Sequence, residues 1–216
     1  MTLVFFDLDD TLLAGDTEAA WANYMLENNL ISDNSFHKKI LEFETQYREG
    51  LLDVVAYTKF LLSPIAGMSE LEVEILAKPF ASHIVNQYRD NLTTNLLNRH
   101  VLDECLITSG TLTFLVKEIA LILGVKVFFG TDPEIVNGVY TGNLEGNPNF
   151  EEEKVVRIKK WLGKRLVHQT AAYSDSVHDL PLLSFVKVPT AVNPDKKLRK
   201  IALDRGWLID DSRLAN

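Results

Sequence analysis

The fold is decided by residues 2–11, which read TLVFFDLDDT. Residues 2–6 form a short run of β-branched, aliphatic and aromatic residues that ends abruptly in acidic residues. Such a run predicts a strand buried on both faces of a parallel sheet. Residues i and i+2 of an extended backbone point the same way, so Asp7 and Asp9 are expected on one side and Leu8 on the other. The stretch therefore predicts two carboxylates at the mouth of a sheet.

Beyond residue 86 the sequence alternates between short apolar runs and helical periodicity. This alternation predicts an α/β fold with a Rossmann-like, doubly wound parallel sheet and helices on both faces. Asn193 followed by Pro194 is typical of a helix N-cap with proline in the first turn. The expected strands are 104–108, 125–129, 170–174, 186–192 and 207–209, the expected helices are 111–123, 151–162 and 195–204, and residues 132–144 suit a hairpin.

Residues 16–85 differ from the rest, because helical periodicity dominates and no strand is evident in the pattern. Gly50 and Pro79 are expected to help divide this stretch into several helices. We therefore expect a core domain of residues 1–15 and 86–216, with residues 16–85 inserted as a helical cap. An insert after the first strand overhangs the carboxyl ends of the strands, where such sheets keep their active sites.

The composition argues against several classes of protein. The chain has 216 residues, of which 46% are hydrophobic and 24% charged, as in ordinary globular domains. Its 22 basic and 30 acidic residues give a formal charge of −8, which argues against a nucleic-acid partner. The pattern predicts no membrane span and no signal peptide, and Cys105 is a lone cysteine. We expect a cytoplasmic protein with no membrane contact.

The carboxylates of Asp7 and Asp9 form the first candidate site. Two converging carboxylates repel each other unless a positive charge lies between them. A hard divalent cation with oxygen ligands, Mg²⁺ in particular, meets that need. The alternative is an acidic turn in which Asp10 or Thr11 caps a helix.

Polar residues near two other predicted elements form further candidates. Ser109 and Gly110 follow an expected strand, where a hydroxyl and free helix N–H groups would hold a phosphate; a serine N-cap is the alternative. Lys154 lies near the start of an expected helix, where a cation opposes the helix dipole. That position indicates a role other than stabilising the helix, and an ordinary surface ion pair is the alternative.

The stretch Tyr173 to Asp179 follows a predicted strand and forms the last candidate. Asp175 and Asp179 are four residues apart, so a helical turn would stack them on one face. His178 points off that face and is expected at the rim of a substrate site or in solvent. All four candidate elements lie at or beside expected carboxyl ends of strands, and together they supply what phosphoryl transfer requires.

In this order the motifs resemble those of the haloacid dehalogenase superfamily phosphatases. The family pattern DxDx[TV] matches residues 7–11, Ser109 matches the second motif, Lys154 the third, and residues 175–179 the fourth. More narrowly, the chain is similar to subfamily IB, which includes phosphoserine phosphatases and some histidinol-phosphate phosphatases. The resemblance implies a helical cap of the C1 type over an α/β core.

The resemblance also implies a mechanism and a cofactor. Asp7 would attack phosphorus to form an aspartyl-phosphate, and Asp9 would act as general acid and then as base. Mg²⁺ would be held by Asp7, by the backbone carbonyl of Asp9 and by Asp175, with Asp179 orienting Lys154 or a metal-bound water. The phosphate oxygens would be held by Ser109, Gly110 and Lys154.

Polar residues of the cap are expected to select the substrate, a small phosphomonoester. Asp16 and Glu18 would recognise an amine and Arg48 a carboxylate, which favours an amino-acid or amino-alcohol phosphate; a solvated helix face is the alternative. Other readings of the chain are a mutase or phosphotransferase that uses the same intermediate, a phosphate-binding regulatory protein, and a nucleic-acid end phosphatase. The acidic charge disfavours the last of these.

Overall fold

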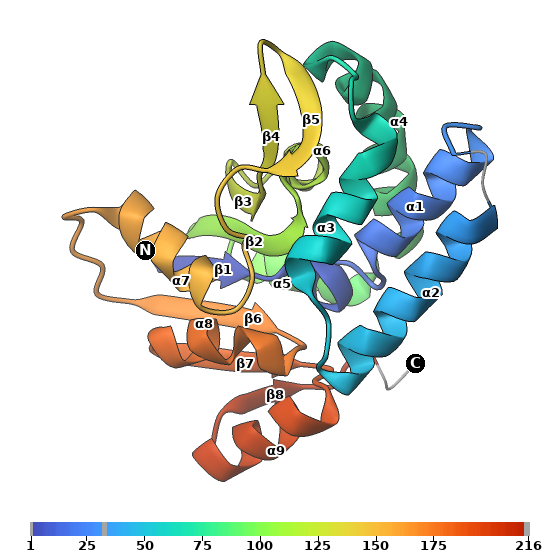
Figure 1. Ribbon diagram of the computed structural model, residues 1–216. Helices are drawn as coiled ribbons and strands as arrows, with labels where there is room; N and C mark the ends of the chain where they lie inside the picture. The colour runs from blue at the N-terminus through green and yellow to red at the C-terminus, as the bar shows by residue number, and fades with distance from the viewer. Residues whose placement is uncertain (1, 32–33, 214–216) are drawn as a thin grey trace.

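The sheet at the centre of the computed structural model has six strands in the order β3-β2-β1-β6-β7-β8, and every neighbouring pair is parallel (Figure 1). The structure describes residues 2–31 and 34–213, apart from the side chains of Asn34, His37, Glu44 and Arg48. The expected α/β fold with a doubly wound parallel sheet is confirmed. The strands are β1 (Leu3–Phe6), β2 (Glu104–Leu112), β3 (Val127–Thr131), β6 (Thr170–Ser174), β7 (Val188–Val192) and β8 (Leu208–Asp210).

Strand β1 lies in the middle of the sheet and is buried along its whole length. Its neighbours come from distant parts of the sequence, since Leu3 pairs with both Glu104 and Thr170. Alternate side chains of β1 enter different cores: Val4 and Phe6 pack in one hydrophobic cluster and Leu3 and Phe5 in the other. The uniformly apolar run of the sequence is thus explained by burial on both faces.

Helices cover both faces of the sheet (Figure 1). The cluster on one face includes buried residues of α7 and α9, and the larger cluster on the other includes residues of α4, α5 and α6. No described helix combines the length and apolarity needed to cross a membrane. The helices of the core are α6 (Thr113–Leu123), α7 (Glu152–Leu162), α8 (Leu180–Phe185) and α9 (Lys196–Arg205).

The alternative role of Ser109 as a helix cap and the expected N-cap at Asn193 are both wrong. Strand β2 continues to Leu112, which is the N-cap of α6 and makes no side-chain capping bond, so Ser109 does not cap that helix. Helix α9 is capped by Asp195, whose carboxylate accepts from the backbone N–H groups of Lys197 and Leu198. Asn193 has a left-handed backbone with φ of 41°, which is outside the conformation of an N-cap.

The segment after β1 is helical over residues 16–85, as expected, and a further helix that the sequence pattern did not predict, α5, precedes β2 (Figure 1). Pro79 does not end a helix, because α4 runs through it from Glu70 to Tyr88. Buried residues on both sides of the proline, Ala77 and Phe80, stabilise the helix through packing that offsets the lost hydrogen bond. The helices are α1 (Thr17–Glu27), α2 (Asn34–Glu49), α3 (Val54–Leu62), α4 (Glu70–Tyr88) and α5 (Asn91–Arg99).

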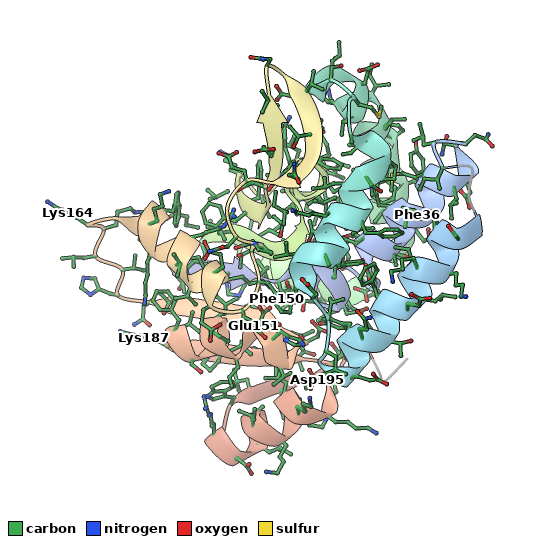
Figure 2. The ribbon with its side chains drawn as sticks, in the orientation of Figure 1. Phe36, Phe150, Glu151, Lys164, Lys187 and Asp195 are labelled. Atoms are coloured by element: carbon green, nitrogen blue, oxygen red, sulfur yellow. The ribbon has the colours of Figure 1, made fainter. Side chains whose placement is uncertain are left out.

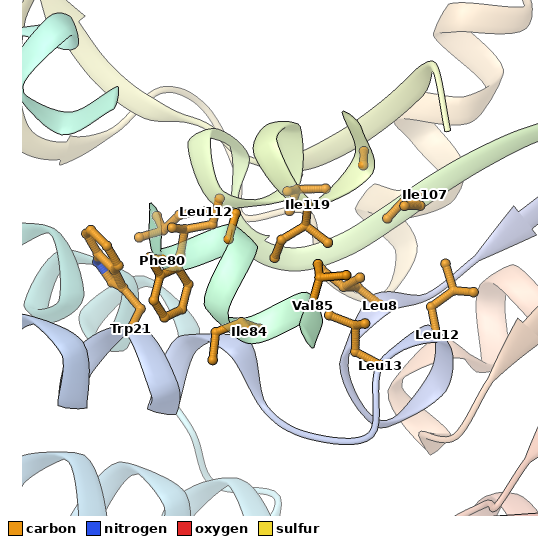
Figure 3. Packing of buried hydrophobic residues seen from close by; sticks show 14 of the residues in the cluster. Leu8, Leu12, Leu13, Trp21, Phe80, Ile84, Val85, Ile107, Leu112 and Ile119 are labelled. Carbon is orange, nitrogen blue, oxygen red and sulfur yellow. The ribbon is translucent and has the colours of Figure 1, made fainter. Parts of the chain in front are cut away.

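The hydrophobic cluster is continuous from the helical segment into the sheet (Figure 3). Phe80 of α4 contacts the ring of Trp21 in α1, with ring centroids 5.0 Å apart at 71°. Val85, one helical turn further, lies near Leu8 and Leu13, which follow β1 (Figure 3). Helix α4 therefore packs against α1 near its middle and against the residues that follow β1 near its C-terminal end.

A two-stranded hairpin, β4 (Pro133–Val136) and β5 (Val139–Leu144), rises from the core beside the helical segment (Figure 1). The backbone N–H of Gly67 donates to the carbonyl of Tyr140 at 2.8 Å, and the N–H of Tyr140 donates to Met68 at 2.9 Å. The N–H of Glu70 donates to Gly138 at 3.0 Å. The chain between α3 and α4 is thus hydrogen-bonded to the β4–β5 hairpin.

Candidate active site

A cavity of about 430 Å³ lies where the carboxyl ends of the strands face the helical segment. Its wall is strongly acidic, and Lys154 is the single lysine or arginine among the described residues that line it. Figure 2 shows Phe150 and Glu151 beside the start of α7, and Phe150 belongs to the wall. The carboxylates that line the cavity are Asp7, Asp9, Asp10, Asp16, Glu18, Asp175 and Asp179.

The centre of the site is a buried lysine between two carboxylates. Asp7 follows β1 directly, and its backbone N–H donates to the carbonyl of Tyr173 at 3.0 Å, which fixes it at the edge of the sheet. The Nζ of Lys154 donates to Asp7 Oδ1 at 2.7 Å and to Asp179 Oδ2 at 2.8 Å. All three residues are buried. Lys154 therefore makes no surface ion pair.

Burial and neighbouring charge shift the pKa values of this group. Burial raises the pKa of Asp7 to about 7; Lys154 opposes that shift, whereas Asp179 and Asp9 add to it. Burial alone would lower the pKa of Lys154, but the charges of Asp179 and Asp7 raise it, so the ammonium stays charged. The site thus holds one fixed positive charge next to the Asp7 carboxylate.

Asp9 is held by four hydrogen bonds. Its Oδ1 accepts from the backbone N–H and the hydroxyl of Thr17, at 2.7 and 2.6 Å. Its Oδ2 accepts from the hydroxyls of Thr111 at 2.6 Å and Ser109 at 3.3 Å. Because Thr17 is the first residue of α1, the position of Asp9 depends on the helical segment as well as on the core.

The end of β2 at Ser109 and Gly110, where the pairing with β3 is interrupted, is fixed by the residues beneath it. The buried Asn149 donates from Nδ2 to the carbonyl of Ser109 at 2.9 Å, and the Thr131 hydroxyl donates to the carbonyl of Gly110 at 2.5 Å. A Cβ at Gly130 would lie 2.6 Å from the carbonyl oxygen of Thr111, so glycine is required for this close approach. Ser109 is itself buried and lines the cavity.

Asp175 and Asp179 are not stacked on a helical turn, as the spacing had suggested. Asp175 lies before a 3₁₀ turn over Val177–Asp179, and its Oδ1 accepts from the Thr11 hydroxyl at 3.0 Å. Asp179 instead accepts from Lys154 and, at 2.7 Å, from the Ser174 hydroxyl. The two carboxylates therefore have different partners: Asp175 bonds to Thr11 in the segment after β1, and Asp179 bonds to Lys154 in α7.

Asp195 fixes the loop that contains Asp175, and it is labelled at the start of α9 in Figure 2. Its backbone N–H donates to the carbonyl of Asp175 at 2.8 Å, and its Oδ2 accepts from the N–H of Val177 at 2.6 Å. The same carboxylate caps α9. One aspartate thus holds both a helix start and the loop after β6.

Aromatic side chains form the rim of the cavity. The ring of His178 lies 5.2 Å from that of Tyr47 in α2 and 4.8 Å from that of Phe150. Its Nδ1 is 2.8 Å from Oε1 of Glu151, and the Tyr47 hydroxyl is 3.2 Å from the Ser176 hydroxyl. His178 therefore lies at the rim, as expected, and contacts both the helical segment and the core.

Asp16 and Glu18 line the opposite wall, whereas the side chain of Arg48 lies outside the described residues. Asp16 is the N-cap of α1 and is exposed to water in the cavity; its Oδ1 accepts from the backbone N–H groups of Glu18 and Ala19 at 2.9 Å. Partial desolvation and the charge of Asp9 raise the pKa of Asp16. Burial and then the charge of Asp16 raise the pKa of Glu18 well above its usual range. Glu18 hydrogen-bonds with the backbone of Leu112 and with the side chain of Tyr57, and its buried Oε1 has no partner among the described residues.

Several residues that shape the site gave no signal in the sequence. Thr17 hydrogen-bonds to Asp9, and Asn149 supports the end of β2 at Ser109. Thr11 and Thr111 lie within the first two motifs, but nothing in the sequence indicates their hydrogen bonds to Asp175 and Asp9. Isolated threonines and asparagines occur throughout the chain, so only their proximity in the fold distinguishes them. Of the predicted residues, all those with described side chains line the cavity.

The donor set fits a small, hard divalent cation. Burial raises the pKa of Asp175 well above its usual range and the charge of Asp7 adds to that, so the two carboxylates repel each other across the cavity. No set of three or more His, Cys, Asp or Glu side chains converges on a metal position within the described chain. Backbone, water and substrate oxygens would have to complete the coordination shell, which suits Mg²⁺ because it retains waters and binds through one or two carboxylates.

These shifts predict that the metal-free protein loses stability as the pH rises. The folded-state pKa of Asp7, about 7, exceeds the ordinary value of 3.8, so the folded protein binds more protons between these pH values. The free energy of unfolding should therefore fall from pH 5 to pH 8. Asp16 adds less, because its side chain is open to water in the cavity. Thermal unfolding in EDTA measures the effect; a melting temperature that rises over this range would contradict it.

Comparison with known proteins places the chain in a family. The family model for haloacid dehalogenase-like hydrolases matches residues 4–184. A histidinol-phosphatase of Neisseria meningitidis is 34% identical over 95% of this chain and 96% of its own length. A phosphoserine phosphatase of Mycobacterium tuberculosis is 30% identical over 98% of this chain and 71% of its own length.

Solved structures agree with this placement. A protein of unknown function from Bordetella pertussis Tohama I matches with a TM-score of 0.88 and 33% identity, covering 98% of this chain and 99% of its own. A substrate-bound phosphoserine phosphatase shares the fold, with a TM-score of 0.66 and 19% identity over 98% and 93% of the two chains. The expected resemblance is confirmed: the chain belongs to the haloacid dehalogenase-like hydrolases and is a phosphatase of that family.

Proposed function

We propose that this phosphatase is a Mg²⁺-dependent phosphomonoesterase that forms an aspartyl-phosphate on Asp7. The observation that supports this most directly is the buried contact of Lys154 with Asp7 and Asp179 at the carboxyl end of β1. The ammonium lies 2.7 Å from the oxygen next to which a transferred phosphoryl group would bind. A positive charge held in place before the substrate arrives stabilises charge that moves during transfer.

The charge of the cavity supports the need for a cation. A phosphomonoester is dianionic near neutral pH. It would enter a cavity whose described wall contains seven carboxylates and one lysine. Carboxylate repulsion would oppose binding unless a divalent cation offset it. Asp7, Asp175 and the backbone carbonyl of Asp9 would hold Mg²⁺, which would neutralise phosphate oxygens when bound.

The residues of the chain would then act in two displacements. A carboxylate oxygen of Asp7 attacks phosphorus in line, its bond to phosphorus forms, and the bond to the leaving oxygen breaks while Asp9 protonates that oxygen. Asp9 then accepts a proton from water as the water attacks phosphorus, releasing phosphate and restoring Asp7. Ser109, Gly110 and Lys154 would hold the phosphate oxygens throughout, with Asp179 orienting the lysine.

The cap-side wall supports a substrate that bears an amine. Asp16 and Glu18 lie in that wall, and Oε1 of Glu18 is buried with no partner among the described residues. A buried carboxylate oxygen without a donor is costly, and an ammonium group of the substrate would supply one. We propose that these two carboxylates bind the substrate amine.

The rim favours an amino-alcohol phosphate with a flat side chain, such as histidinol phosphate. The rings of Tyr47, His178 and Phe150 lie in contact there and offer a stacking surface for an imidazole. Phosphoserine is the second candidate, supported by the mycobacterial relative. Its carboxylate would need a cation; Lys154 is already paired with Asp7 and Asp179, and Arg48 is the residue that we propose for this role.

The test is phosphate release from a panel of monoesters, with Mg²⁺ and with EDTA. The panel contains histidinol phosphate, phosphoserine, phosphoethanolamine and an aryl phosphate. We expect Mg²⁺-dependent hydrolysis of all four with the highest kcat/KM for histidinol phosphate. Equal rates in EDTA would contradict the metal dependence. Product formation only in the presence of an added acceptor alcohol would indicate a phosphotransferase.

Removing the amine receptor should change selectivity and leave the chemistry intact. In Glu18→Gln the KM for histidinol phosphate should rise about 10-fold or more, because the substrate ammonium loses a charged partner. The KM for the aryl phosphate, which has no amine, should stay near the wild-type value. Glu74→Gln, which changes a half-buried carboxylate of α4 that is paired with Lys78 and does not line the cavity, serves as the matched control. Equal rises in KM for both substrates would show that Glu18 does not bind the substrate amine.

A further inference from the structure

The last described residue of the chain, Arg213, reaches the loop that follows β1. Its Nη1 donates to the backbone carbonyl of Asp10 at 2.6 Å, and its Nη2 donates to that of Thr11 at 3.2 Å. These residues are separated from Arg213 by 203 and 202 positions in the sequence. The guanidinium side chain is 17% exposed, so most of its surface is covered by the protein. The guanidinium group of Arg213 thus contacts the backbone of Asp10 and Thr11, directly after Asp9.

Arg213 is itself held in place from two sides. Its Nε donates to Oδ2 of Asp90 at 2.7 Å, and Asp90 is the N-cap of α5. Its backbone N–H donates to Oδ1 of Asn193 at 3.2 Å. Two residues earlier, Asp211 forms a bidentate pair with Arg199 of α9. Such anchoring orients the fixed fork of the guanidinium toward its carbonyl partners.

The backbone that Arg213 holds is strained. Asp10 has a φ of 51°, a left-handed conformation that is unfavourable for a residue with a side chain. The guanidinium bonds to the carbonyl of Asp10 and to the next carbonyl along the chain. Hydrogen bonds from a charged donor on these two carbonyls stabilise that conformation.

Thr11 connects this backbone to Asp175. Its hydroxyl donates to Oδ1 of Asp175 at 3.0 Å, and it also accepts from the backbone N–H of Asp175 at 3.0 Å. A shift of Thr11 would therefore move both the carboxylate and the backbone of Asp175. No other described side chain donates a hydrogen bond to that carboxylate.

We propose that Arg213 is a positioning residue for the metal site: it fixes the Asp10–Thr11 backbone, and Thr11 in turn orients Asp175 toward Mg²⁺. This inference rests on the proposed function, because it assigns the purpose of the contact to the cation held by Asp7 and Asp175. Outer residues that orient metal ligands typically change metal affinity 10- to 100-fold when they are removed. Arg213 acts through two backbone carbonyls and one hydroxyl, and it touches neither substrate nor metal.

The experiment measures Mg²⁺ binding to the full-length protein by isothermal titration calorimetry, alongside kcat. Arg213→Met should weaken Mg²⁺ binding about 10-fold, and Arg213→Lys should lie between it and the wild type, since lysine cannot bridge both carbonyls and Asp90. Arg165→Met is the matched control, because it removes an exposed bidentate pair with Glu104 on another part of the sheet. We expect wild-type Mg²⁺ affinity from that control.

A double-mutant cycle tests whether the residues act in series. Thr11→Val removes the hydroxyl that bonds Asp175, and it should weaken Mg²⁺ binding by itself. Adding Arg213→Met to Thr11→Val should then lower the Mg²⁺ affinity little further, because Arg213 can no longer act on Asp175 through the Thr11 hydroxyl. Fully additive losses would overturn the proposal, and so would a lowered melting temperature with unchanged Mg²⁺ affinity, which would make Arg213 a mere anchor of the chain end.

A metal-independent measurement separates this proposal from the proposed function. Hydrogen exchange of the backbone amides in residues 8–13 should be faster in Arg213→Met than in wild type and in Arg165→Met. If wild-type protein binds no Mg²⁺ and releases no phosphate, the proposed function fails, and the metal-positioning role fails with it. If wild-type protein binds Mg²⁺ and Arg213→Met changes neither affinity nor exchange, only the role of Arg213 is overturned.

Discussion

The Asp7→Asn variant is expected to lose phosphate release by about 10⁴-fold or more, since an amide cannot attack phosphorus as a carboxylate does. Asp7 is placed at the end of a fully buried strand and contacts Lys154 at 2.7 Å. The variant keeps that geometry, because asparagine has the same shape and its amide oxygen still accepts from the lysine. Steady-state phosphate release with histidinol phosphate and the aryl phosphate measures the loss.

The same substitution should not destabilise the fold. Burial and two neighbouring carboxylates raise the pKa of Asp7 to about 7, so the charged form is disfavoured where it lies. A neutral amide removes that penalty, and Lys154 keeps its buried ion pair with Asp179. Because no charge is left unpaired, the melting temperature in EDTA at pH 8 should equal or exceed that of the wild type. Asp204→Asn, at an exposed position of α9, is the control for the chemical change alone. Near-wild-type turnover in Asp7→Asn would rule out Asp7 as the nucleophile.

Substituting Lys154 should damage both activity and stability. In Lys154→Met, a side chain of similar length remains, but Asp7 and Asp179 lose their shared cation. Removing one partner of a buried ion pair typically costs about 3–5 kcal/mol of unfolding free energy. Turnover should fall by about 10³-fold, because the substrate phosphate also loses a fixed positive charge.

The pH dependence distinguishes this effect from simple loss of packing. The stability deficit of Lys154→Met against wild type should shrink as the pH falls from 8 to 5, because protonation removes the charges that the lysine no longer offsets. Lys159→Met, on the exposed part of the same helix, controls for the change of residue type. Urea unfolding at both pH values measures the deficit; a deficit independent of pH would show that the charge pairing contributes little.

Most of the sheet could be predicted from the sequence, because its signal is local. The run before Asp7 is apolar at every position since β1 is covered on both faces, and that pattern is visible without any knowledge of its neighbours. Pro79 misled the helix boundaries because its effect is offset by packing of Phe80 and Ala77, which only the fold reveals. Likewise, an asparagine before a proline is typical of a helix N-cap, but Asp195, and not Asn193, accepts the capping hydrogen bonds of α9.

The predicted site residues with described side chains lie around one cavity, yet the bonds that orient them could not be foreseen. Asp9 is held by Thr17 and Thr111, which are 8 and 102 residues away. Hydrogen bonds between such distant positions depend on how elements pack, and a threonine in a sequence carries no mark of its partner. The division of the chain into a cap over residues 16–85 and a core stays a prediction; α4 crosses residue 85 and packs against α6.

The central place of β1 has a consequence for how the protein is made. Its partners on either side begin at Glu104 and Thr170, so the first strand is synthesised long before either neighbour exists. At typical rates of translation, residue 170 emerges about 10–30 s after residue 3. Both edges of this apolar segment stay unpaired until Glu104 emerges, and one edge stays unpaired until Thr170 emerges, in a form prone to pair with other chains. The strand at the centre of the finished enzyme is therefore exposed to aggregation during synthesis.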